Sequence, residues 1–202
     1  MPATPLFVTK LYRAELAEAR ALNMELALAC RTIAAEDRAG QEWSREKGYK
    51  GYTSYASLND LPKRDPAFAE LKKALDLHAR KFADDLHLDL KSRRLALDSI
   101  WINVLEPGGV HTGHIHPHAV ISGTYYVQVP PGSSSLKLED PRLPLMMAAP
   151  PRREHAPLEE QTFVYLKPKE GEVLMWESFV RHEVPPNGAK KARVSISFNY
   201  RW

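Results

Sequence analysis

Two segments in the first half of the chain carry apolar residues at helical spacing. From about residue 12 to residue 38, apolar positions recur every three or four residues between charged and amide side chains, namely Leu16, Ala19, Leu22, Leu26, Cys30 and Ile33. This period predicts an amphipathic helix. A second helix is predicted to begin at Asp65-Pro66, because an acidic N-cap followed by proline is a common helix start. Both helices need an apolar surface to cover.

After residue 94 the pattern changes to short apolar or alternating runs, which are typical of β-strands. The runs cover residues 95–105, 120–129, 136–138, 162–166, 172–176 and 192–200. Prolines and glycines lie between them and favour a sandwich or barrel over a parallel sheet. We therefore expect an α+β protein whose helical region, residues 1–94, braces a β core at residues 95–202 within one structural unit.

The last run alternates most regularly. Arg193, Ser195 and Ser197 occupy one face, and Val194 and Ile196 occupy the other. If the helices cover the apolar face, the polar face points into the barrel. A buried arginine is costly unless it is paired, so this face predicts a cavity that holds a charged ligand or an ordered polar network.

Composition and charge narrow the function classes. The 202 residues are 44% hydrophobic and 26% charged, which is ordinary for a folded globular chain, and no run is long enough to span a membrane. The N-terminus lacks a basic segment followed by an apolar one, so we expect a cytoplasmic protein. A net charge of +3 with dispersed basic residues argues against a nucleic-acid partner. Cys30 is interpreted as a core residue. The sequence leaves open whether the protein forms an oligomer.

Histidines provide the candidate chemistry. His114 and His116 are two residues apart, so on an extended strand both imidazoles would leave the same face, and His182 could supply a third nitrogen. Three protein ligands leave open positions on a metal ion for substrate or water. His111 and His118 are spare candidates. The nearby Arg193 indicates that an anion lies beside the metal.

Several motifs follow one another in order along the second half of the chain: Trp101-Ile-Asn103, His114-Ile-His-Pro117, Ile121–Tyr126, Glu139–Arg142, Gly171–His182 and Arg193–Asn199. Together they resemble a family of 2-oxoglutarate- and Fe(II)-dependent oxygenases of bacteria and phages that is distantly similar to prolyl hydroxylases. The resemblance covers roughly residues 98–202. It implies a double-stranded β-helix, a relative of the jelly roll, with the metal between two sheets.

By the same resemblance, His114, His116 and His182 match the ligands of Fe(II), and Arg193 matches the arginine that grips the far carboxylate of 2-oxoglutarate. Tyr126, Ser195 and Ser197 match positions that can hydrogen-bond that carboxylate. The wider superfamily has His-x-Asp where this chain has His114 and His116, so the site carries one more unit of positive charge. The expected reaction is hydroxylation of a small molecule or peptide that the sequence does not identify.

Two alternatives also fit the histidines. One is a cupin-like metalloenzyme with three histidines that does not use 2-oxoglutarate, and the other is a metal-binding module without turnover. Arg193 on a polar strand face favours the oxygenase. Polar and aromatic residues that could line the substrate mouth are Tyr49, Tyr52, Tyr55, Asn103 and Arg142.

Overall fold

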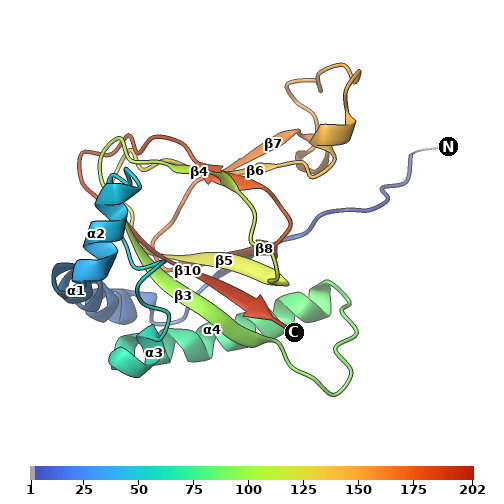
Figure 1. Cartoon of the computed structure of the whole chain (residues 1–202). Coiled ribbons are helices and arrows are strands. Elements are labelled where there is room, and N and C mark those ends of the chain that lie inside the picture. Colours follow the sequence, from blue (N-terminus) through green and yellow to red (C-terminus); the bar gives the residue numbers. More distant parts are fainter. Residues whose placement is uncertain (1–2) are drawn as a thin grey trace.

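A computed structural model describes residues 3–202, in which two antiparallel sheets face each other and helices cover the outer face of the larger one (Figure 1). The larger sheet has the order β1 (Leu11–Glu15), β8 (Glu172–Glu177), β5 (Ile121–Gln128), β10 (Arg193–Arg201), β3 (Ala96–Leu105) and β2 (Gly51–Thr53). The smaller sheet has the order β4 (His111–His114), β9 (His182–Val184), β6 (Leu136–Glu139) and β7 (Phe163–Leu166). The predicted fold class, a double-stranded β-helix with helices packed on one sheet, is confirmed.

The helices are α1 (Ala19–Glu36), α2 (Arg38–Glu46), α3 (Leu61–Arg64) and α4 (Pro66–Asp85), with two short 3₁₀ turns at Leu143–Leu145 and Leu158–Glu160. The apolar sides of α1 and α4 pack on the larger sheet, where Leu26 and Phe68 share a buried core with Ile196 and Phe198. Cys30 lies in this core, as predicted, and burial raises the pKa of its thiol to about 12.

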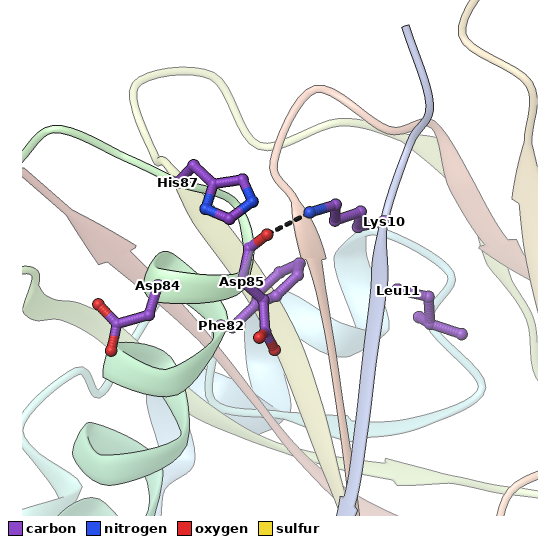
Figure 2. A pocket seen from close by; sticks show the side chains of 6 residues that line it. All are labelled: Lys10, Leu11, Phe82, Asp84, Asp85 and His87. Carbon is purple, nitrogen blue, oxygen red and sulfur yellow. Dashed lines mark hydrogen bonds between the residues drawn. The ribbon is translucent and has the colours of Figure 1, made fainter. Parts of the chain in front are cut away.

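Both ends of α4 are satisfied by polar groups. The Asp65 carboxylate accepts a hydrogen bond from the backbone N–H of Ala67 at 2.8 Å, so the predicted acidic cap is confirmed. At the other end, the Lys10 ammonium donates to the backbone carbonyl oxygen of Asp85 (Figure 2). This contact ties the segment before β1 to the helix beside a surface hollow of about 510 Å³. None of the three predicted metal ligands lines that hollow.

One part of the first half differs from the prediction. Residues 11–15, where the helix was expected to begin, form β1 and pair with β8, so the helix prediction was wrong there. Pairing with an existing sheet edge overrides the local helical period. A second strand of the first half, β2, pairs with β3. The division of the chain at residue 94 stays a prediction. Residues 1 and 2 of the N-terminal region lie outside the described range, and residues 3–94 contribute strands as well as helices.

The alternation of β10 has the predicted consequence. Val194, Ile196 and Phe198 face the core beneath the helices, whereas Arg193, Ser195 and Ser197 line a cavity between the sheets. Across residues 3–202, no helix is long and apolar enough to cross a bilayer.

Candidate metal centre

Two paired strands of the smaller sheet bring the first and third predicted ligands together. His114 is the last residue of β4, and it lies opposite His182, the first residue of β9. His116 follows two residues after β4 and is not on a strand, which differs from the expected extended pair. Its backbone N–H donates to the carbonyl oxygen of Ser178 at 3.1 Å, and Pro117 behind it has no N–H to continue pairing.

The three imidazoles converge on one point. One nitrogen of each, from His114, His116 and His182, lies within 4.8 Å of the others. The ring centres of His114 and His182 are 4.4 Å apart, and that of His116 is 5.0 Å from His114 and 5.1 Å from His182. Three imidazoles in such proximity, two from one stretch of chain and one from a distant strand, are a donor set for a divalent metal ion.

Backbone carbonyls determine which nitrogen is free on two of the rings. His114 Nδ1 lies 2.6 Å from the carbonyl oxygen of Thr112, and His182 Nδ1 lies 3.0 Å from that of Val180. A carbonyl only accepts hydrogen bonds, so each Nδ1 must carry the hydrogen. In the neutral ring this leaves the lone pair on Nε2, which is the arrangement that metal-ligating histidines commonly have.

The enclosed position also keeps two of the rings neutral. Burial, with a smaller contribution from His114, lowers the pKa of His182 to about 3. The same two causes lower the pKa of His116 to about 4. Only a neutral imidazole offers a lone pair to a metal, so at neutral pH both rings are ready to coordinate one.

The other end of the cavity is cationic. Arg193 is 2% exposed, and its Nε has no hydrogen-bond partner within residues 3–202. One terminal nitrogen donates to the carbonyl oxygen of Ser134 at 3.3 Å, and the guanidinium carbon lies 5.8 Å from the ring centre of Tyr126. Burial raises the pKa of the Tyr126 phenol to about 12, so its hydrogen is retained. A buried guanidinium with a free donor and a neutral phenol beside it suits an anionic ligand.

A chain of hydrogen bonds fixes the polar side chains next to Arg193 on the cavity wall. Thr53 donates to the amide oxygen of Asn103 at 3.0 Å, and the Asn103 amide donates to the Ser197 hydroxyl at 3.0 Å. Ser197 thereby keeps its own hydrogen for a further acceptor, and Ser195 lies on the same cavity wall. Asn103, a candidate for the substrate mouth, is 2% exposed and lines the cavity.

The remaining candidates are scattered. His118 lies in an exposed turn, Arg142 is paired with Asp140 at 2.8 Å, and Tyr52 donates to Asp37 at 2.8 Å. Tyr55 is 55% exposed and contacts Trp101 edge to face, with 5.3 Å between the ring centres. Of these candidates, Tyr55 therefore has the position expected of a residue at the mouth.

Tryptophans at the site were missed by sequence reasoning. Trp101 lies 5.7 Å from the His116 ring, and Trp176 lies 4.7 Å from the His182 ring. Trp176 Nε1 is buried and has no partner in the described part of the chain. Its strand run, with Glu172 and Leu174 on the same face, was the signal that could have placed it between the sheets.

The family model described as "Putative 2OG-Fe(II) oxygenase" matches residues 99–199. The chain therefore belongs to the 2-oxoglutarate- and Fe(II)-dependent oxygenase family, so it is an oxidoreductase whose cofactors are Fe(II) and 2-oxoglutarate. The resemblance noted on the sequence motifs is confirmed, and the three convergent histidines fit this class.

Solved structures agree on the fold. A prolyl-4-hydroxylase of Pseudomonas putida has a TM-score of 0.63 at 18% identity, with 95% of this chain and 92% of that chain covered. A Trichoplax adhaerens prolyl hydroxylase in complex with a peptide fragment of hypoxia inducible factor has a TM-score of 0.63 at 12% identity, covering 95% and 83%. AviO1 from Streptomyces viridochromogenes has a TM-score of 0.62 at 15% identity, covering 96% and 90%. A search of curated proteins gives no match.

Proposed function

We propose that His114, His116 and His182 hold the Fe(II) ion and that Arg193 binds the distal carboxylate of 2-oxoglutarate, with Tyr126, Ser195 and Ser197 beside it. One observation carries the proposal. A buried guanidinium, whose Nε has no partner in the described part of the chain, lines the same cavity as three imidazoles that converge within 4.8 Å. A metal alone does not need a cation near it, whereas a dianion that bridges the metal and the guanidinium needs both.

Each side chain then has a distinct role. Thr112 and Val180 hold two of the imidazoles in the tautomer that coordinates through Nε2. The planar fork of Arg193 can offer two parallel donors to a carboxylate, which an ammonium cannot. Since an imidazole ligand brings no negative charge, a bound Fe(II) ion would keep its full charge of about +2, which would strengthen its attraction for a dianion.

When bound, Fe(II) with 2-oxoglutarate and O₂ supplies the oxidising power that hydroxylates a C–H bond, which no side chain can supply. The chain positions the reactants. The Trp101 ring packs between the His116 ring and the ring of the exposed Tyr55. The substrate therefore approaches the metal site along this aromatic side of the cavity. We propose a small molecule or a peptide as substrate rather than a nucleic acid, and a reaction in the cytoplasm.

The test is anaerobic reconstitution. Protein prepared without metal is given Fe(II) and then 2-oxoglutarate, and the metal-to-ligand absorption band is recorded. Oxygen is then admitted, and succinate is measured. The expected result is the band before oxygen and succinate after it. The absorption band and succinate formation should both be lost in His182→Gln and both be retained in His118→Gln. This pair of results would tie the two signals to the convergent histidines, because His118 is exposed and lies outside the cluster.

A metal-bound protein without the band would contradict the proposal. Binding of one ion that depends on His182, together with no affinity for 2-oxoglutarate, would instead indicate the three-histidine metalloenzyme. Binding of both cofactors without succinate, across a panel of amino acids and peptides, would indicate a module without turnover.

A further inference from the structure

A tyrosine and a histidine from distant segments are in contact at the cavity that contains Arg193. Tyr49 lies in the loop before β2, and His111 is the first residue of β4. The Tyr49 hydroxyl is 3.0 Å from His111 Nε2, and the two rings meet edge to face with 5.2 Å between their centres. His111 lines the cavity that contains Arg193 and the three convergent imidazoles, but it is not part of the imidazole cluster.

The contact with Tyr49 favours one tautomer of His111. A phenol has a single hydrogen, and His111 Nε2 is the only acceptor that the Tyr49 hydroxyl reaches within residues 3–202. If Tyr49 donates, Nε2 is the acceptor and the imidazole hydrogen must be on Nδ1. His111 Nδ1 makes no hydrogen bond to any described residue, so its N–H is free for a ligand.

Electrostatics point the same way. Burial, with a further contribution from the Arg193 guanidinium, lowers the pKa of His111 to about 3, so the ring is neutral at physiological pH. Burial also raises the pKa of Tyr49, so its phenol keeps the hydrogen, and the charge of Arg193 is close enough to act on it. A neutral donor can stand beside a guanidinium without repulsion, and both can bind one carboxylate.

We propose that His111 is a second donor to the distal carboxylate of 2-oxoglutarate, through Nδ1–H, and that Tyr49 is a positioning residue that holds this tautomer. The inference rests on the proposed function, since it requires 2-oxoglutarate to bind with its distal carboxylate at Arg193. It also gives the N-terminal region a role at the site, because Tyr49 comes from the segment between α2 and β2.

The experiment removes the interaction from each side. Binding of 2-oxoglutarate, and of 2-oxopentanoate, which has a methyl group in place of the distal carboxylate, is measured by calorimetry on the Zn(II)-loaded protein. For His111→Phe we expect the affinity for 2-oxoglutarate to fall by about ten- to a hundredfold, the value of one hydrogen bond to a charged group. The affinity for 2-oxopentanoate should stay unchanged. His111→Gln, which retains an N–H donor, should restore part of the loss.

The chain provides a matched control. The Tyr12 hydroxyl lies 2.8 Å from His78 Nδ1, in a second tyrosine–histidine pair, and neither of these residues lines the cavity. His78→Phe should leave the affinity for both ligands unchanged. Tyr49→Phe should weaken 2-oxoglutarate binding by about two- to tenfold, because both tautomers of His111 then become accessible.

A second readout is independent of affinity. In ¹⁵N-labelled Zn(II) protein, long-range ¹H–¹⁵N spectra report the tautomer of each histidine. We expect His111 to carry its hydrogen on Nδ1, with a downfield shift of that resonance when 2-oxoglutarate is added but not when 2-oxopentanoate is added. In Tyr49→Phe the Nε2–H tautomer should appear.

The inference is overturned if His111→Phe weakens both ligands equally, or neither, while Arg193→Met weakens 2-oxoglutarate alone. In that result Arg193 still binds the distal carboxylate, so the proposed function stands. If Arg193→Met leaves 2-oxoglutarate binding unchanged, the proposed function itself fails. An Nε2–H tautomer in the unsubstituted protein would also overturn the inference.

Discussion

Replacing Arg193 with methionine should weaken the binding of 2-oxoglutarate strongly while changing the free energy of unfolding little. The Arg193 guanidinium is 2% exposed, and its Nε has no partner among the described residues. It makes a 3.3 Å hydrogen bond to Ser134 and lies over the face of Tyr126 at 5.8 Å. Losing the hydrogen bond costs about 1 kcal/mol, and losing the cation–π contact costs about 0.5–2 kcal/mol. Removing an unsatisfied buried donor returns about 1–3 kcal/mol. Methionine fills a similar volume, so the free energy of unfolding should change by no more than about 2 kcal/mol.

Binding should change far more. Two charge-assisted hydrogen bonds to the carboxylate are together worth about 3–6 kcal/mol, so the affinity for 2-oxoglutarate should fall by about 10²- to 10⁴-fold. The assays are urea denaturation of the metal-free protein and calorimetric titration of the Zn(II) protein. Arg201→Met is a suitable control, because this arginine lies on the same strand but is exposed and does not line the cavity.

The opposite outcome would refute the reasoning about Arg193. If Arg193→Met unfolds several kcal/mol more easily yet binds 2-oxoglutarate with unchanged affinity, the arginine is a structural element of the barrel. The unpaired Nε would then have no connection with a ligand.

Three further predictions concern pH and stability. The folded metal-free protein keeps His116 and His182 neutral, with pKa values of about 4 and about 3, whereas the unfolded chain binds protons near pH 6.5. Stability should therefore fall as the pH drops below 6.5, by up to about 1.4 kcal/mol per pH unit for each histidine, and a urea midpoint independent of pH would contradict this. Gly123→Ala should lower the free energy of unfolding by about 1–3 kcal/mol, because the new methyl group would lie 2.6 Å from the Leu174 carbonyl oxygen; an unchanged melting temperature would show that β5 can shift. Asp65→Ala should cost about 1 kcal/mol through the lost N-cap, measured by urea denaturation, with Asp65→Asn retaining most of the stability.

Local sequence patterns predicted those features of the fold that depend only on neighbouring residues. The alternation of β10 predicted which side chains face the helices, because successive residues of a strand point to opposite faces whatever the fold. The start of α4 was readable because an N-cap acts over only a few residues. The helix expected from residue 12 failed because β1 is held by pairing with β8, more than 150 residues away, which no local period reports.

At the site, the sequence by itself determined the types of donor: three imidazoles and a guanidinium on the polar face of a strand. Only the tertiary structure decided their arrangement. The register of β4 against β9 places His114 opposite His182, and a turn rather than a strand presents His116. The partner of His111 comes from Tyr49, 62 positions away. Hydrogen-bond partners across such separations depend on how sheets and loops pack, and for that reason the tautomers and unpaired donors of this cavity became visible only in three dimensions.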